Sequence, residues 1–463
     1  MIEKQNQQGE VCESNEASGV NEPVSLSTDI VIVGGGMAGL ATACLMAASG
    51  KKIIVLEKAL PSGPDSWGEG FDPRVSAITR ASENILRQCG AWDFIQTQRI
   101  SPYTDMDVWD SDGTGNIQFH ASDADVAYLG HIIENRITQY ALYLACQKHK
   151  NIEIKAVGLR AIKPISKVSE DVIDDASNDI CGEGLWLVDL ENDQQLMAAL
   201  VVGADGANSS VRTLTGIATR EWDYGHTAIV TTVETEKPHD GIARQPFLTS
   251  GPLGFLPLRA NQQDEQSCLS SIVWSANEDY TKTLMAMGEA EFNLALTRAM
   301  EGRLGSVTKS DTRFSFPLRQ RHAVDYVLPG LALVADAAHT LHPLAGQGIN
   351  MGFLDVAVLA EEVCSNVAKD LHPAETMGLR RYQRRRKGHN LLMMSAMEGF
   401  KRLFGAEPMP VRLLRNTGMG ILNGHYLAKG QILQHAMGFG GDLPAAAKPS
   451  SEVSAEVTVE VEL

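Results

Sequence analysis

Apolar residues form two short unbroken runs near the start of the chain. Residues 29–33 read D-I-V-I-V and residues 52–57 read K-I-I-V-L-E. Because the apolar positions are continuous rather than alternating, both runs predict strands buried on both faces, as in a parallel sheet. Residues 37–49, between them, are rich in Ala and Leu and are followed by Gly50, which predicts a helix. A strand, a helix and a strand in about 30 residues form the βαβ unit of a dinucleotide-binding sheet.

The rest of the chain changes from strand patterns to helix patterns. Strand-like runs occupy 152–203 and 224–318, a helical segment interrupts the second block at 277–300, and residues 354–436 are mostly helical. We therefore predict a mixed α/β fold with a Rossmann-like nucleotide-binding domain, an inserted and mostly antiparallel sheet domain, and a C-terminal helical region. The expected divisions are a disordered tail at 1–28, the nucleotide-binding domain at 29–215 and 318–365, the sheet domain at 216–317, the helical region at 366–444, and a disordered acidic tail at 445–463.

Charge and cysteine content argue against several classes of function. The 40 Lys and Arg residues are outnumbered by 57 Asp and Glu, and a net charge of −17 would repel nucleic acid. The 7 cysteines show no C-x-x-C spacing, so neither a zinc site nor a disulfide framework is indicated. The N-terminal segment lacks the pattern of a signal peptide, and no apolar run reaches the roughly 18 residues of a membrane span. We expect a cytoplasmic protein without a metal site, for which any membrane contact would be peripheral.

The first candidate site is a glycine-rich turn between the two apolar strands. Its G-x-G-x-x-G motif consists of Gly34, Gly36 and Gly39, and Glu57 closes the second strand. Glycines let the backbone approach a pyrophosphate, the next helix offers free N–H groups to the phosphates, and an acid at this distance accepts the ribose hydroxyls. FAD or NAD fits such a site. The cofactor-binding residues expected here also include Met37, Ala38 and Lys58.

Two further motifs follow along the chain. One is V-V-G-A-D-G-A-N-S-S-V-R at 201–212, and the other is L-V-A-D-A-A-H-T-L-H-P-L-A-G-Q-G-I-N-M-G at 333–352. With the glycine turn, they resemble the three fingerprints of the flavoprotein aromatic hydroxylases of the p-hydroxybenzoate hydroxylase class. Further stretches, among them F-D-P-R-V-S-A-I-T-R-A-S, H-I-I-E-N-R and L-R-R-Y-Q-R-R-R, resemble the ubiquinone-biosynthesis hydroxylases of that class, above all the 2-polyprenylphenol hydroxylases. The likeness covers residues 29–444.

The resemblance implies an enzyme. It would hold FAD non-covalently in the nucleotide-binding domain, take hydride from NADPH or NADH, and hydroxylate an aromatic ring with O2 through a hydroperoxide at flavin C4a. No second glycine motif follows a strand, so the nicotinamide dinucleotide is expected to dock only transiently. The implied substrate is a polyprenylphenol lipid, and the implied partners are proteins of a biosynthetic complex. Three alternatives stay open: another ring position, another phenol, and a non-catalytic flavoprotein in such a complex.

The resemblance also assigns roles to residues around the cofactor. Asp336 would accept a hydrogen bond from a ribityl hydroxyl of FAD, because an ionised carboxylate is an acceptor only. Asp205 and Gly206 would lie near the flavin and the route of the nicotinamide. Arg74 would reach the FAD phosphates or the edge of the ring, and Asn135 would contact the ribityl region.

A helix that starts in the third motif is expected to face the pyrimidine edge of the flavin. Its N-terminal N–H groups would stabilise negative charge on the reduced ring. The first residues of this helix are Gly346, Gln347, Gly348, Ile349 and Asn350. Pro343 would shape the floor between flavin and substrate, and with Gly346, Gln347 and Gly348 it is a candidate catalytic position.

Three features do not follow directly from the motifs. Ala335 stands where the family usually has a glycine, which adds a methyl group close to the cofactor. His339 and His342 flank the third motif and are expected to pack or cap rather than to shuttle protons, and no protein acid or base emerges. Residues 380–415 join a basic run to a stretch rich in Met, Leu and Phe, typical either of peripheral contact with an anionic membrane or of a helix packed on the nucleotide-binding domain.

Overall fold

The parallel strands lie in the middle of a mixed sheet, here called the first sheet. The computed structural model describes residues 25–165, 184–340, 348–404 and 409–449. Within these ranges the first sheet contains β1 (Ser25–Val33), β2 (Ile53–Leu56), β8 (Ile152–Lys155), β9 (Leu159–Pro164), β10 (Trp186–Leu190), β11 (Gln195–Gly203), β18 (Val327–Leu328) and β19 (Leu331–Leu333). Its order is β18-β19-β11-β1-β2-β8, and β10 and β9 extend it beside β11.

The middle of the first sheet explains the unbroken apolar runs. Neighbouring strands β19, β11, β1, β2 and β8 pair in parallel, and every residue of β2 is buried. Helix α1 (Met37–Met46), rich in alanine, packs between α4 (Asn135–Gln147) and α8 (Gly348–Val367). Because α1 is covered by these neighbours and the sheet, nearly all its residues are buried, as expected for a helix that is apolar all round.

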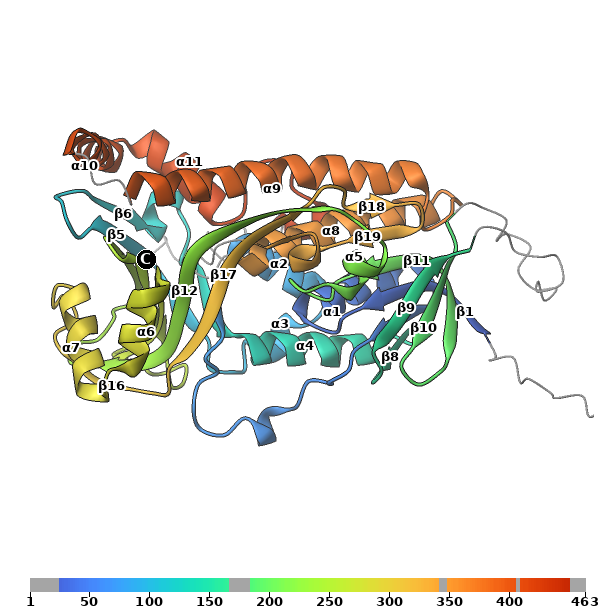
Figure 1. The fold of residues 1–463 in the computed structure, drawn as a ribbon, viewed down its shortest axis with the longest axis horizontal. Coiled ribbons are helices and arrows are strands. Elements are labelled where there is room, and N and C mark those ends of the chain that lie inside the picture. The colour runs from blue at the N-terminus through green and yellow to red at the C-terminus, as the bar shows by residue number, and fades with distance from the viewer. Residues whose placement is uncertain (1–24, 166–183, 341–347, 405–408, 450–463) are drawn as a thin grey trace, which may run out of the picture.

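A second sheet is mostly antiparallel. Its strands in the described part of the chain are β5 (Asp105–Asp110), β6 (Asn116–His120), β12 (Thr219–Thr235), β13 (Ile242–Leu248), β14 (Gly251–Leu258), β15 (Leu269–Asn277), β16 (Val307–Ser310), β17 (Phe314–Ala323) and β20 (His339–Thr340). Helices α6 (Glu278–Ala286) and α7 (Glu289–Ala299) cover it with a separate apolar core. In Figure 1 the long strands β12 and β17 arch from this sheet toward the first sheet.

The remaining elements join the two sheets. A small antiparallel sheet contains β3 (Val75–Thr79), β4 (Ser101–Tyr103) and β7 (Gly130–Glu134). The other helices are α2 (Arg80–Gln88), α3 (Trp92–Ile95), α5 (Ser210–Leu214), α9 (Thr376–Phe404), α10 (Met409–Gly424) and α11 (Tyr426–Ala436). Helix α9 packs on α8 and extends along the top of the molecule in Figure 1 toward α10.

Helix α10 is bonded to the β5–β6 hairpin at the edge of the second sheet. Asn416 accepts a hydrogen bond from the N–H of Gly115, in the turn between β5 and β6, at 3.0 Å. Arg415 pairs with Asp110 of β5, and both side chains are only 2% exposed. The C-terminal helices therefore contact the first sheet's helices through α9 and the second sheet through α10.

Three of the expected divisions are wrong in detail. Strand β1 begins at Ser25, inside the expected N-terminal tail, because residues 25–28 pair with β11. Residues 445–447 form a short helical turn, and the fully buried Ala447 accepts a hydrogen bond from Asn84, so the expected acidic tail begins with packed residues. Strands β5 and β6, expected in the nucleotide-binding domain, extend the second sheet because β5 pairs in parallel with β13.

Candidate functional site

The three sequence motifs converge because each follows a strand of the first sheet. Residue 34 follows β1, residue 57 follows β2, residue 205 lies just after β11, and residue 336 lies just after β19. These four strands are neighbours and run in parallel. Their carboxyl ends therefore meet at one edge of the sheet, which is where open α/β sheets bind ligands.

The three glycines of the first motif are needed for different structural reasons. Gly34 has φ +105°, and a Cβ there would lie 2.5 Å from the carbonyl oxygen of Ala204. A Cβ on Gly39 would overlap the carbonyl oxygen of Gly34. Gly36, in contrast, has an ordinary extended conformation with φ −72°, and a Cβ there would meet no atom within 4 Å. Gly34 and Gly39 are thus required by the packing of the turn, whereas Gly36 leaves space at the start of α1.

Glu57 is held by the backbone on both sides. Its Oε2 accepts from the N–H of Gly35 at 2.7 Å, and its Oε1 accepts from the N–H of Ala59 at 3.0 Å. The carboxylate is therefore fixed beside the glycine turn. Lys58 points elsewhere and forms an ion pair with Glu191.

The second motif forms a short loop that caps α5. Asp205 Oδ2 accepts from the N–H of Val211 at 3.0 Å, while its Oδ1 is buried and has no partner among the described residues. The buried Arg212 donates to the carbonyl oxygens of Ala207 and Ala337, each at 2.8 Å. Arg212 therefore ties the loop of the second motif to that of the third.

The third motif places Asp336 on a strained turn. Ala335 has φ +51°, a left-handed conformation that a non-glycine residue rarely adopts. Its N–H donates to Asp355 of α8 at 3.3 Å. The Asp336 side chain is exposed to solvent. Surrounding protein atoms still desolvate its carboxyl and raise its pKa, and the positive charges of His339 and Arg74 oppose this rise only in part. Because the side chain is exposed, its carboxylate is accessible to a ligand.

Arg74 and Asn135 approach this edge from the small sheet. The carbonyl oxygen of Arg74 accepts from the N–H of Asn135 at 2.9 Å. The exposed Arg74 guanidinium lies 5.4 Å from the centre of the Phe316 ring, and its charge opposes the rise that desolvation causes in the pKa of Asp336. Asn135 uses its side-chain oxygen to accept from Ser76 at 2.7 Å, which leaves its NH2 group as the donor for a ligand.

Helix α8 begins beside β3. The side chain of Asn350 donates to the carbonyl oxygen of Ala77 at 2.7 Å and accepts from the N–H of Thr79 at 3.1 Å. Gly348 and Ile349 precede it at the partly exposed helix start. Pro343, Gly346 and Gln347, expected as catalytic positions, lie outside the described residues, as does His342.

Two supporting residues were missed by the sequence reasoning. Gln139, one helical turn after Asn135 in α4, donates to the carbonyl oxygen of Gly35 at 2.9 Å. Glu134, only 1% exposed, accepts from Arg99 at 2.7 Å and from the N–H of Asp72 at 2.6 Å, which holds the loop that leads to Arg74. The spacing of Asn135 and Gln139, four residues apart on one helix face, was a signal for the first. No local sequence pattern indicated the role of Glu134.

Known proteins are similar to this chain in sequence and in fold. A family model described as "FAD binding domain" matches residues 185–395, and one described as "Thi4 family" matches residues 23–97. The chain is 35% identical over 411 residues to 3-demethoxyubiquinol 3-hydroxylase of Escherichia coli, covering 89% of this chain and 98% of that protein. It is also 35% identical over 413 residues to ubiquinone hydroxylase UbiL of Rhodospirillum rubrum, covering 89% of each. The chain belongs to the ubiquinone-biosynthesis FAD-dependent hydroxylases.

The solved structures agree with the fold of this hydroxylase family. The p-nitrophenol 4-monooxygenase PnpA from Pseudomonas putida superimposes with a TM-score of 0.68 at 19% identity, over 90% of this chain and 99% of that one. At this identity the likeness shows the fold alone. The predicted enzyme class, with FAD as cofactor and NAD(P)H and O2 as co-substrates, is confirmed by the family and its relatives.

The residues at this edge fit FAD. Gly36 leaves open space where a phosphate would approach the N-terminus of α1, and the orphaned Oδ1 of Asp205 is a buried acceptor in need of a donor. Glu57 would accept from ribose hydroxyls, and Asp336 is an accessible acceptor. The individual roles of these residues stay predictions.

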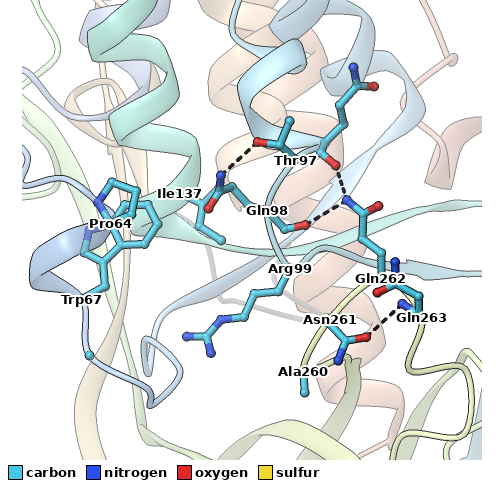
Figure 2. A pocket seen from close by; sticks show the side chains of 12 residues that line it. Pro64, Trp67, Thr97, Gln98, Arg99, Ile137, Ala260, Asn261, Gln262 and Gln263 are labelled. Atoms are coloured by element: carbon cyan, nitrogen blue, oxygen red, sulfur yellow. Dashed lines mark hydrogen bonds between the residues drawn. The ribbon is translucent and has the colours of Figure 1, made fainter.

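A cavity of about 570 Å³ is lined by other residues. Figure 2 shows Pro64 and Trp67 on one side of it and Gln262 and Gln263 on the other. Arg99, which also lines it, is already engaged with Glu134. None of the predicted cofactor residues lines this cavity, so we do not assign it to FAD.

The basic run of α9 is mostly used inside the protein. Arg381 and Arg385 pair with Glu362, Arg386 is buried against Asp355, and Lys387 donates to a backbone carbonyl. The packed-helix alternative therefore accounts for most of these cations. No helix in the described part of the chain is long and apolar enough to span a bilayer.

Proposed function

We propose that this hydroxylase adds oxygen to the aromatic ring of a polyprenyl-substituted phenol in ubiquinone biosynthesis. The observation that carries the proposal is the convergence of three family motifs at the carboxyl ends of four neighbouring parallel strands, in a chain 35% identical to two ubiquinone-pathway hydroxylases. When bound, FAD supplies the redox and oxygen chemistry.

The protein's own residues would hold the cofactor and exclude water. Glu57 would accept the ribose hydroxyls of the adenosine, and the N–H groups at the start of α1 would face the pyrophosphate. Arg74 would neutralise phosphate charge, and Asp336 would orient the ribityl chain. The N-terminus of helix α8 would face the flavin ring and would favour negative charge on it through the helix dipole.

The ring position is proposed as that of a 2-polyprenylphenol hydroxylase. The Escherichia coli relative is named for another reaction, the 3-hydroxylation of 3-demethoxyubiquinol, and both named relatives share the same 35% identity with this chain. Mass analysis of the quinone intermediates that accumulate in a strain deleted for the gene would distinguish the two ring positions. Accumulation of polyprenylphenol supports the proposal, whereas accumulation of demethoxyubiquinol assigns the other position.

A purified-protein assay tests catalysis itself. The purified protein should be yellow, and a short-tailed 2-prenylphenol should stimulate its oxidation of NADH or NADPH and appear as a hydroxylated product. A protein that binds FAD but shows neither effect with any quinone precursor would be a non-catalytic member of a biosynthetic complex.

We further propose that α9 contacts the membrane that contains the lipid substrate. Leu391 and Leu392 are 38% and 68% exposed, and the exposed Gly388 and Ser395 lie one turn to either side of them. The solvent-facing side of this part of the helix therefore carries no charge, while the exposed Arg384 lies just before it and would favour anionic headgroups.

Exchange of Leu392 for Asp should weaken co-sedimentation with phosphatidylglycerol vesicles. Leu294, 49% exposed on α7, is the matched control, because its exchange for Asp should leave vesicle binding unchanged. Equal vesicle binding by wild type and Leu392→Asp would show that this side of α9 does not contact the membrane.

A further inference from the structure

A buried polar cluster lies directly behind the third motif. At its centre is Asp355 of α8, whose side chain is 0% exposed. Around it stand His339 at the end of the motif loop, and Arg386 and Asn390 of α9. A carboxylate is rarely buried to this extent unless several donors satisfy it.

Asp355 accepts from four donors, which divide between the two sides of the cluster. Its Oδ2 accepts from the N–H of Ala335 at 3.3 Å and forms a hydrogen bond with Nε2 of His339. Its Oδ1 accepts from Nε of Arg386 at 2.7 Å and from the side chain of Asn390 at 3.0 Å. One oxygen thus holds the loop that carries Asp336, and the other is held by the C-terminal helix.

The cluster is stabilised as an ionised group. Burial by itself would raise the pKa of Asp355, but the charges of His339 and Arg386 and their hydrogen bonds outweigh it and hold the pKa well below its usual range. Arg386 is itself 2% exposed and also donates to Asn390 at 3.0 Å. Removing the guanidinium would leave a buried carboxylate without one of its two counter-charges, and such a group must find new partners or take up a proton.

We propose that Arg386 is a positioning residue for FAD binding, acting through Asp355 on the loop of the third motif. Ala335 is in the left-handed conformation at φ +51°, which a non-glycine residue rarely adopts. Its N–H bond to Asp355 helps to keep that conformation, and the conformation aims the next residue, Asp336, outward. Helix α9, which supplies no predicted cofactor contact, thereby sets the geometry of one.

Arg415 provides a matched control. It also lies in the C-terminal helices and also pairs with a buried aspartate, Asp110, with both side chains 2% exposed. It contacts β5 of the second sheet rather than the motif loop. A purely structural loss of a buried ion pair should therefore affect Arg386→Met and Arg415→Met alike, while a loss of loop position should affect only the first.

The experiment measures the FAD dissociation constant of full-length protein by quenching of flavin fluorescence, on variants whose near-ultraviolet circular dichroism matches wild type. Arg386→Met should weaken FAD binding tenfold or more, Arg386→Lys should restore part of the loss, and Arg415→Met should stay within about twofold of wild type. An unchanged dissociation constant in Arg386→Met, or an equal change in Arg415→Met, would overturn the proposal. Should Arg386→Met not fold, Asn390→Ala takes its place, with a smaller weakening expected and an unchanged constant again decisive against it.

The proposal rests on the FAD site proposed above, and the separate role of Asp336 within that site is tested by Asp336→Asn. Weaker FAD binding in both Asp336→Asn and Arg386→Met supports both roles. If Asp336→Asn binds FAD normally and Arg386→Met does not, the contact of Asp336 is refuted while the positioning of the loop by Arg386 stands.

Discussion

Replacing Gly36 by alanine should separate cofactor binding from folding. The backbone of Gly36 is extended, with φ −72°, and an added Cβ would meet nothing within 4 Å, so the fold of the FAD-free protein should tolerate the methyl group. Loss of a favourable N-cap residue and reduced freedom of the unfolded chain oppose each other, each at about 0.5–1 kcal/mol. The free energy of unfolding without FAD should therefore change by less than about 1 kcal/mol.

FAD binding by Gly36→Ala should be weakened much more. The methyl would occupy the space through which a pyrophosphate reaches the N-terminus of α1, and overpacking of this kind costs about 1–3 kcal/mol. Since about 1.4 kcal/mol is a factor of ten, the FAD dissociation constant should rise roughly 5- to 150-fold.

Thermal unfolding of the FAD-free protein and fluorescence titration with FAD measure the two effects. Gly39→Ala is the contrasting variant, because its Cβ would overlap the carbonyl oxygen of Gly34 and should destabilise the protein even without FAD. The reasoning is refuted if Gly36→Ala binds FAD as tightly as wild type, or if it destabilises the FAD-free protein as much as Gly39→Ala does.

Three further predictions concern stability. Arg415→Ala leaves Asp110 buried without its cation and should lower the free energy of unfolding by about 3–5 kcal/mol in urea titrations, and a loss under 1 kcal/mol would contradict the pairing. Ala335→Gly relieves the left-handed alanine and should stabilise the protein by roughly 0.5–1 kcal/mol, whereas destabilisation would show that its methyl group contributes packing that outweighs the strain. Burial, with the charges of His339 and Lys387, lowers the pKa of His322 to about 4. The unfolded chain therefore binds the proton more tightly, stability falls as the pH drops from about 6.5 toward 4, and His322→Gln should flatten this slope in urea titrations across that range.

The meeting of the motifs could be predicted from the sequence because it depends on local patterns. Each motif follows an apolar run, and parallel strands place their carboxyl ends at one edge. Which residues pin the loops could not be predicted in the same way. Arg386 belongs to a run of four cations, R-R-R-K, that has the appearance of a solvated helix face, yet it is 2% exposed because Asp355, 31 residues earlier, lies against it.

The borders of the sheets could not be predicted from local patterns either. The tendency of residues 105–120 to form strands is local, but their place in the second sheet depends on pairing between β5 and β13, more than a hundred residues later. Ala335 is a mixed case. The sequence showed that an alanine replaces the usual glycine, and the structure adds that its backbone keeps the left-handed conformation that a glycine would favour.

The path of the C-terminal segment sets practical limits on shortening the protein. After α9 and α10 have touched both halves of the molecule, the chain comes back to α2, where Ala447 is fully enclosed and its carbonyl oxygen receives a bond from Asn84. A C-terminal truncation that removes Ala447 would expose apolar surface on α2, in the N-terminal part of the chain that is synthesised early. An affinity handle or fluorescent fusion is therefore best attached beyond residue 449, and residues up to 447 must be synthesised before this surface of α2 is covered.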